Sequence, residues 1–117
     1  AVQYLLSYSS RMQVQHYKTA EGRFPVTEWL ESLRDRTARP RIVAALDKLQ
    51  FGSRGDWRSV GEGVREMRLH FGPGYRVYCG QRGTEFILLL CGGDKGSQAR
   101  DMETAHDYWK DFKIRTR

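Results

Sequence analysis

The chain has 117 residues, a length typical of one domain that builds its own hydrophobic core. Its 20 Lys and Arg against 14 Asp and Glu give a net charge of +6, which favours a polyanionic partner: RNA, DNA, the ribosome or an acidic protein. No apolar run is long enough to span a membrane, no signal peptide is evident, and no Cys and His spacing suits zinc. We therefore expect a cytoplasmic protein without membrane contact, metal or cofactor.

Residues 1–11 (AVQYLLSYSSR) look unlike the rest of the chain, and Met12 stands where a natural start could be. We interpret this segment as an N-terminal extension, with a short extra strand as an equal alternative. Residues 12–117 then form the folded domain. Weak alternation over residues 13–18 predicts its first strand.

Two helices are predicted next. The first opens at Pro25, and its apolar face has helical spacing: Val26, Trp29, Leu30 and Leu33. The second starts near Pro40 and ends at Gly52, with an apolar stripe of Ile42, Leu46 and Leu49, helped by Val43. Because the helices are short and closely connected, we expect an antiparallel helical hairpin laid on a sheet. Their connection carries a basic cluster that is either only solvated or in contact with a polyanion: Arg34, Arg36, Arg39 and Arg41.

Residues 53–63 (SRGDWRSVGEG) predict a long glycine-rich loop. Arg54, Trp57 and Arg58 make it basic and aromatic, a combination that suits unpaired nucleotides. Packing of Trp57 back onto the domain explains the same pattern at least as well.

Three consecutive strands are predicted near residues 64–71, 75–81 and 84–91, separated by short glycine turns. If the first turn is a three-residue loop, Phe71 lies opposite Tyr75, Arg68 opposite Tyr78, and His70 opposite Arg76. Alternation then gives a core face of Met67, Leu69, Phe71, Tyr75, Val77 and Cys79. The other face is polar: Glu66, Arg68, His70, Arg76 and Tyr78.

An arginine pair on neighbouring strands favours a bound anion, because like charges across strands are destabilising; an ordinary solvated face is the alternative. The third strand is apolar at every position, so both of its faces should be covered. The cover for the polar side is a last helix over residues 98–112, with a buried stripe of Met102, Ala105, Trp109 and Phe112. A two-residue turn at Arg82 and Gly83 leaves Cys79 and Cys91 unpaired, which suits a reducing compartment.

The loop of residues 92–97 (GGDKGS) feeds this helix, with Ser97 as its expected N-cap. A helix N-terminus beside Lys95 is a candidate anion site, although a cap and a solvated lysine explain the loop equally well. Together with Arg68 and Arg76, Lys95 would complete a three-cation cluster for phosphate.

Three segments are recognisable: FPVTEWLESLRDRTARPRI, GEGVREMRLHFGPGYRVYCG and LLLCGGDKGSQARDMETA. With them, the chain from Met12 to Phe112 resembles the RelE/ParE superfamily of bacterial toxins, in its HigB-like addiction module killer protein group. The resemblance implies an α+β domain of order β-α-α-β-β-β-α, with a mostly antiparallel twisted sheet, an N-terminal helical hairpin and a C-terminal helix.

Members of the RelE branch are metal-independent endoribonucleases that cut mRNA in the ribosomal A site. A co-encoded antitoxin inactivates them, and in the HigB-like branch it usually has a helix-turn-helix (HigA-like). The resemblance therefore implies the ribosome, mRNA and such an antitoxin as partners. It leaves two alternatives open: a ParE-like toxin that inhibits DNA gyrase, and an inactive relative that only binds RNA or antitoxin.

The resemblance also implies which residues of this chain occupy the functional positions of these toxins. Arg76 is the arginine of the G-Y-R segment, and Arg68 falls where better-studied members have a lysine. Glu66 departs from a second lysine of some members, His70 lies near another basic position, and Lys95 lies in the loop that supplies the C-terminal basic residue. We expect the arginines to stabilise the phosphate, Glu66 or His70 to accept the proton, and Lys95 to neutralise the leaving side. The expected RNA contacts are Arg54, Trp57, Arg58, Tyr78, Gln98 and Arg100.

Overall fold

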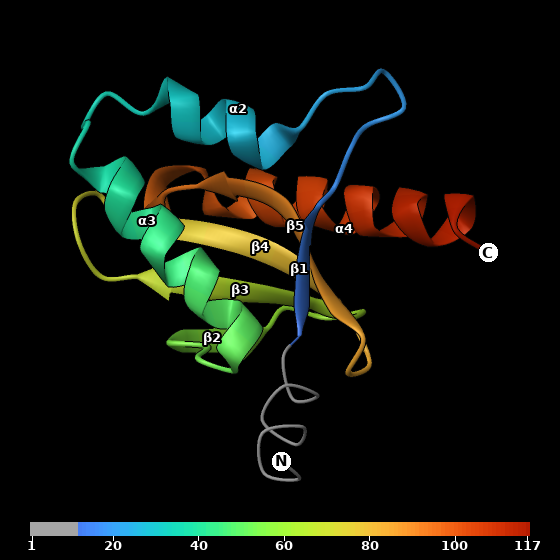
Figure 1. The fold of residues 1–117 in the computed structure, drawn as a ribbon. Helices are drawn as coiled ribbons and strands as arrows, with labels where there is room; N and C mark the ends of the chain where they lie inside the picture. Colours follow the sequence, from blue (N-terminus) through green and yellow to red (C-terminus); the bar gives the residue numbers. More distant parts are fainter. Residues whose placement is uncertain (1–11) are drawn as a thin grey trace, which may run out of the picture.

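The computed structural model describes residues 12–117, and the predicted N-terminal extension lies outside the described residues. Within them the chain is an α+β domain with three α-helices and a five-stranded mixed sheet of order β1-β5-β4-β3-β2 (Figure 1). β1 is parallel to β5, and the other neighbours are antiparallel. The strands are β1 (Gln13–His16), β2 (Asp56–Ser59), β3 (Val64–Leu69), β4 (Tyr75–Arg82) and β5 (Phe86–Gly93). The helices are α2 (Pro25–Ser32), α3 (Ala38–Asp47) and α4 (Gln98–Arg115), with 3-10 turns η1 (Lys48–Phe51) and η2 (Lys95–Ser97).

The sheet is covered on both faces, by α2 and α3 on one side and by α4 on the other (Figure 1). β5 serves both cores, because Ile87 and Leu89 pack with α2 and α3 while Leu88 and Leu90 pack with α4. The predictions of an all-apolar third strand and of a covering C-terminal helix are confirmed. None of the helices in residues 12–117 combines the length and apolar character required to cross a membrane.

Two glycines let the helices approach the sheet closely. A Cβ on Gly80 of β4 would overlap the Trp109 ring of α4, and a Cβ on Gly92 of β5 would overlap the Trp29 ring of α2. Each tryptophan ring therefore packs directly against the backbone of a glycine, at a position that has no side chain. These contacts set the distance of α4 and α2 from the sheet.

The predicted loop over residues 53–63 is wrong in part, because it contains β2. This strand pairs antiparallel with β3, with Trp57 opposite Met67 and Arg58 opposite Glu66. Only four residues alternate there, between Gly55 and Gly61, which is too short a pattern to stand out from the glycines. The sheet accordingly has one strand more than the predicted order.

The predicted register of the first hairpin is also wrong, by two residues. Phe71 donates its N–H back to the Leu69 carbonyl and Gly74 donates to Phe71, so the chain leaves the ladder after Leu69. Leu69 then lies opposite Tyr75 and Arg68 opposite Arg76. Because the shift is even, the assignment of side chains to the two faces survives.

The second hairpin has a longer turn than predicted, since Arg82 pairs with Phe86 and leaves three residues in the loop. A bulge between Tyr78 and Cys79 shifts the register again. Cys79 lies opposite Leu89, Tyr78 lies opposite Cys91, and both thiols are free as predicted.

The expected antiparallel helical hairpin is not formed, because α2 and α3 diverge across the sheet (Figure 1). The α3 helix begins at Ala38, before the predicted start, and continues into η1 up to Gly52. Arg39 donates to the carbonyls of Leu30 and Glu31, which satisfies acceptors at the C-terminal end of α2. Val43 is 38% exposed and so is not part of the core that it was expected to join.

Candidate functional site

Strands β2, β3 and β4 place their polar side chains on the face that α4 covers. Two ladders of paired residues cross these strands. Asp56 lies opposite Arg68, which lies opposite Arg76, and Arg58 lies opposite Glu66, which lies opposite Tyr78. Directly paired residues point to the same side of a sheet, so these six side chains form one polar group. α4 begins beside this group, at Gln98.

Glu66 is the centre of the group, and its side chain is fully buried. Its Oε1 accepts from Arg58 Nε at 2.8 Å. Its Oε2 accepts from Tyr78 Oη at 3.0 Å and from Gln98 Nε2 at 2.9 Å, and Arg76 Nε lies 3.7 Å away. Burial alone raises the pKa of Glu66, but the hydrogen bonds from Arg58, Gln98 and Tyr78 outweigh it and leave the pKa lowered. The carboxylate is therefore held ionised.

This environment does not fit the expected role of Glu66 as a proton acceptor for a substrate. The carboxylate has no exposed surface, and donors already occupy both of its oxygens. It is instead placed to orient the cations around it. Tyr78 is also fully buried, and burial together with the bond to Glu66 raises its pKa, so the expected contact of Tyr78 with RNA is wrong for this arrangement.

Arg68 of β3 and Arg76 of β4 lie directly opposite each other. The prediction that they share one face is confirmed, but the predicted pairing of Arg68 with Tyr78 is wrong. Arg76 is almost buried and donates from Nη1 to the Gly74 carbonyl at 2.7 Å. The Nε atoms of both arginines are buried and have no hydrogen-bond partner among residues 12–117. Unpaired buried donors are costly unless a ligand accepts from them, which suits an anion at this point.

His70 does not face Arg76 as expected, because it lies beyond the end of β3. It is exposed, and its Nε2 lies 2.5 Å from Asp56 Oδ2. Arg68 Nη2 donates to the other oxygen of Asp56 at 3.0 Å. The hydrogen bonds from His70 and Arg68 lower the pKa of Asp56. Asp56 therefore fixes the positions of one arginine and one histidine together.

Asp56 is the site residue that the sequence does not reveal. It was assigned to a loop, and only the pairing of β2 with β3 brings it to Arg68. The signal was the short alternation around Trp57, whose ring packs on the opposite core with Met67. That packing confirms the alternative in which Trp57 lies back on the domain.

Lys95 lies exposed in η2, close to the other cations. A Cβ placed on Gly74 would lie 3.2 Å from Arg76 Nη1 and 3.6 Å from Lys95 Cβ, so both residues approach this glycine. The expected cap is only half right: Ser97 precedes α4, but its hydroxyl bonds to Asp101 and to the backbone of Asp94. Asp94 caps η2 by accepting from the Gly96 N–H, so the loop is ordered by its own acid.

The other residues that were expected to contact RNA lie in different parts of the structure. Arg58 and Gln98 belong to the Glu66 network, with Arg58 still 46% exposed at its side chain. Arg100 is exposed on the first turn of α4. Arg54 lies outside the network and donates to the Leu49 carbonyl at 2.9 Å. In the part of the chain from Met12 onward, no three His, Cys, Asp or Glu side chains converge as metal ligands.

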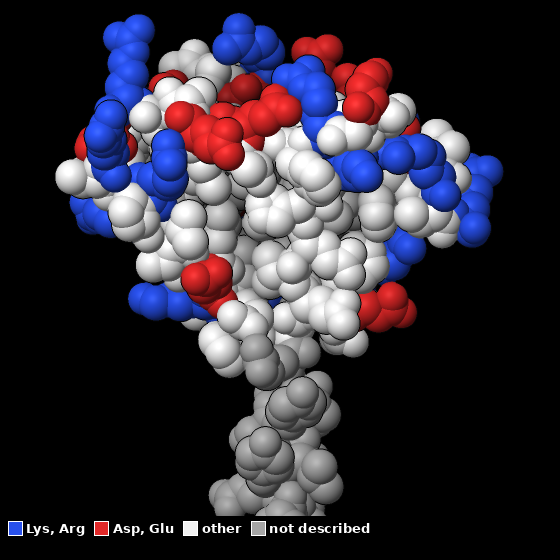
Figure 2. Space-filling view, turned by 45° about the horizontal axis from the view of Figure 1, so that its top comes forward, with Lys and Arg blue, Asp and Glu red and all other residues white. Residues whose placement is uncertain are grey.

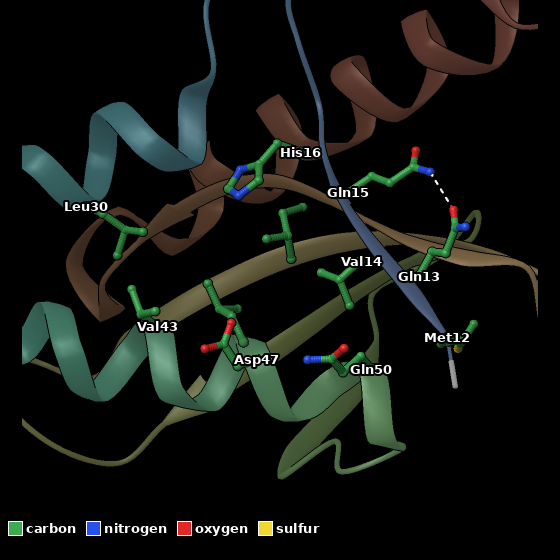
Figure 3. Close-up of a pocket in the computed structure, with 11 residues that line it drawn as sticks. Met12, Gln13, Val14, Gln15, His16, Leu30, Val43, Asp47 and Gln50 are labelled. Atoms are coloured by element: carbon green, nitrogen blue, oxygen red, sulfur yellow. Dashed lines mark hydrogen bonds between the residues drawn. The ribbon is translucent and has the colours of Figure 1, made fainter. Parts of the chain in front are cut away.

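A groove of about 620 Å³ lies elsewhere, between β1, α2 and α3 (Figure 3). It is lined by Val14, Leu30, Val43 and Leu46 with a few polar side chains, and it includes none of the predicted site residues. Figure 2 shows that the middle of this side of the molecule is mostly uncharged, with Lys and Arg side chains gathered to its left and right. The chemistry of this groove does not suit a phosphate.

Comparison with known proteins finds a relative in Haemophilus influenzae. The chain is 43% identical to an uncharacterized protein of Haemophilus influenzae over 77 residues, which cover 66% of this chain and 78% of the relative. No family model matches the chain, and no solved structure matches it.

Proposed function

We propose that the chain, which belongs to the same family as the uncharacterized Haemophilus influenzae protein, is a toxin of a type II toxin-antitoxin module. In this proposal it is a HigB-like member of the RelE/ParE superfamily, with a RelE-like topology extended by β2. Its activity is metal-independent endonucleolytic cleavage of translated mRNA on the ribosome, in the cytoplasm.

The observation that supports this most is the opposed pair Arg68 and Arg76. Each guanidinium has a buried Nε without a hydrogen-bond partner among residues 12–117, and Arg76 is already immobilised by its hydrogen bond to Gly74 and its ion pair with Glu66. Guanidinium groups bind phosphate oxygens in pairs, and preorganised cations stabilise the charge that develops on a pentacoordinate phosphate. The arrangement suits a phosphodiester bound at the two guanidinium groups, on the polar face of β3 and β4.

Cleavage begins when the 2′-hydroxyl loses its proton and its oxygen attacks the adjacent phosphorus. The bond to the 5′-oxygen breaks, that oxygen gains a proton, and the products end in a 2′,3′-cyclic phosphate and a 5′-hydroxyl. When the neutral His70 donates from Nε2 to Asp56, its Nδ1 is left as an acceptor for the 2′-hydroxyl proton. General-base help of this kind typically contributes about 10²–10⁴-fold.

The other residues have supporting roles in the proposal. Asp56 orients His70 and Arg68, and Glu66 orients Arg58 and Arg76, so both are positioning residues. Lys95 is placed beside Arg76 to neutralise the leaving side. The antitoxin would shield this basic face with acidic or helical segments, by electrostatic complementarity.

The test is to map mRNA 5′ ends after brief induction of the wild type, Arg76→Lys and Arg68→Ala. We expect cuts within translated frames in the wild type and a loss of at least 100-fold in both variants, since removing one donor to a developing charge costs about 10²–10³ in rate. Arg36→Ala is the matched control, because Arg36 is exposed on the α2–α3 connection.

Circular dichroism and thermal unfolding of each purified variant separate loss of the site from loss of the fold. Growth arrest without cuts would overturn the nuclease proposal and direct the next assay to DNA gyrase supercoiling. If folded Arg76→Lys and Arg68→Ala still produce the cuts, the nuclease proposal stands but the assignment of its site to these two arginines is contradicted.

A further inference from the structure

Arg58 of β2 is held at one end of its guanidinium and free at the other. Its Nε donates to Glu66 Oε1 at 2.8 Å. Within residues 12–117, no group accepts a hydrogen bond from either of its Nη groups. Its side chain is 46% exposed, against 34% for Arg68 and 11% for Arg76, so it is the most accessible arginine of the polar face. Arg58 therefore offers a fork of two N–H donors to a ligand.

The anchor of this fork is rigid. Glu66 is fully buried, and its other oxygen accepts from Tyr78 of β4 and Gln98 of α4. The carboxylate cannot follow Arg58 into solvent, so it sets the position and direction of the guanidinium. Immobilising a long side chain is one of the costs of binding a ligand, and the bond to Glu66 reduces that cost before the ligand arrives.

The chemistry of Arg58 differs from that of the opposed arginine pair. Arg68 and Arg76 each have a buried Nε without a hydrogen-bond partner among residues 12–117, whereas the Nε of Arg58 is satisfied. Glu66 also lies closer to Arg58, at 2.8 Å, than to Arg76, at 3.7 Å. A fork whose charge is compensated at its base suits two neutral acceptors better than it suits a second phosphate.

Guanine presents such a pair of acceptors. Its Hoogsteen edge has O6 and N7 side by side, whereas the same edge of adenine has N7 beside an N–H donor that repels a guanidinium. Arginine bound to O6 and N7 is the commonest base-specific contact of proteins with DNA. In RNA, the bases that are read in this way are unpaired, as they are in a single-stranded message.

Strand geometry places this contact next to the phosphodiester. Arg58 is two residues along β2 from Asp56, which lies opposite Arg68, and two residues of a strand cover about 7 Å. Both side chains are on the α4 face of the sheet. Because Glu66 pairs with Arg76 as well as with Arg58, one carboxylate fixes the base contact relative to the phosphate contact.

We propose that Arg58 binds O6 and N7 of a guanine next to the cleaved bond and so determines the sequence preference of the site. This inference rests on the proposed function, because it names the base beside the same phosphodiester. It requires guanine at one constant position relative to the cut.

The first measurement maps mRNA 5′ ends after brief induction of the wild type, Arg58→Lys and the control Arg36→Lys, which is exposed on the α2–α3 connection. Lysine keeps the positive charge of Arg58 but has no fork. At one fixed position beside the cut, the ratio of guanine to adenine should exceed that of the same transcripts by about 5-fold or more in the wild type and the control. Arg58→Lys should lose this preference. The base composition at the cuts is the readout, and it does not depend on how far total cutting falls.

The second measurement uses a fluorescent oligouridine with a single guanine, whose 2′-hydroxyls are methylated so that it cannot be cleaved. The guanine is replaced by adenine, by 7-deazaguanine, which lacks N7, or by inosine, which keeps O6 and N7. The wild type should bind the guanine and inosine strands alike and the adenine strand about 5-fold or more weakly, with 7-deazaguanine weakened in the same direction. Arg58→Lys, with its fold checked by thermal unfolding, should bind all four strands alike.

Three results would overturn the inference: cuts without a guanine preference in the wild type, a wild-type preference that persists in folded Arg58→Lys, or equal binding of guanine and 7-deazaguanine. A preference for cytosine, whose O2 and N3 are also adjacent acceptors, would overturn it too. Failure of the proposed function looks different. The wild type then produces no cuts, while a preference of the uncleavable strand for guanine over 7-deazaguanine still supports the contact of Arg58 with guanine.

Discussion

Glu66 shows how one buried charge can organise a surface of opposite sign. Arg58, Tyr78, Gln98 and Arg76 come from β2, β4 and α4, and all of them approach its two oxygens. A buried carboxylate is stable only when it is paired and hydrogen-bonded, which this one is. The cost of burying Glu66 is thus offset by donors that the site needs in fixed positions.

Replacing Glu66 with Gln should remove this organisation. The variant leaves Arg58 and Arg76 without a counter-charge, so we expect the free energy of unfolding at pH 7 to fall by about 2–3 kcal/mol. Urea unfolding followed by tryptophan fluorescence measures this. Glu103→Gln, at an exposed position of α4, is the matched control and should change it by less than about 0.5 kcal/mol.

The pH dependence of the same variant has a definite sign. The folded pKa of Glu66 is lowered from its ordinary value of 4.5, so its stabilising contribution is complete above that value and is lost as the pH falls through the folded pKa. Between pH 4.5 and the acid transition, the wild type should therefore lose stability more steeply than Glu66→Gln. Equal slopes in the two proteins would contradict the assignment of an ionised Glu66.

At the scale of the element, side-chain alternation predicted which residues share a face, but not which residues are opposed. Met67 and Val77 belong to one core and Arg68 and Arg76 to the other face, as alternation requires. The opposition of Arg68 and Arg76 depended on where the chain leaves β3, and a hydrogen bond from Phe71 back to Leu69 decides that. The local pattern of apolar and polar residues indicates which side chains share a face of the sheet. The register between strands depends on loop geometry, which that pattern does not contain.

Strand β2 marks a second limit of the same kind. Its four residues become a strand because β3 offers an edge and Trp57 finds a place beside Met67. That is a tertiary effect, so nothing local distinguishes the segment from a glycine-rich loop. The histidine and the arginines of the site could be chosen from the sequence, but Asp56, which holds two of them, could not.

The docking of α4 gives a prediction about an element. Gly80→Ala would push a methyl group into the Trp109 ring, and overpacking of this kind costs about 1–3 kcal/mol. The cost should be much smaller in a Trp109→Leu background, where the ring is absent. A double-mutant cycle of urea unfolding measures this coupling, and additive effects would show that the glycine does not seat the ring.

At the scale of the whole molecule, one sheet separates two cores, and α4 is attached to the rest at both of its ends. Gln98 bonds to Glu66 at the start of the helix. Near its end, Asp111 accepts from Tyr17 at 2.5 Å, and Arg115 donates to the Lys18 carbonyl at 2.7 Å. Burial and the bond to Asp111 raise the pKa of Tyr17 to about 12, so Tyr17 keeps its proton and its hydrogen bond to Asp111 throughout the physiological pH range.

The two cysteines report on the two cores separately. Cys79 packs with α2 and α3, and Cys91 packs with α4. Burial raises the pKa of Cys79 to about 12 and raises that of Cys91 as well, so neither thiol should react while the chain is folded. Because α4 is attached at both ends and β5 contributes to both cores, we expect the two cores to open in one cooperative step.

Pulsed alkylation at increasing urea, read by mass spectrometry of the two cysteine peptides, tests this. Both peptides should be labelled with the same urea midpoint, equal to that of tryptophan fluorescence. The variant Asp111→Asn, which weakens the attachment near the end of α4, should lower the midpoint of Cys91 relative to that of Cys79. If Cys91 is labelled first in the wild type, α4 is a separate unit that detaches from a sheet still held by α2 and α3, and the attachments at its ends do not make the domain cooperative.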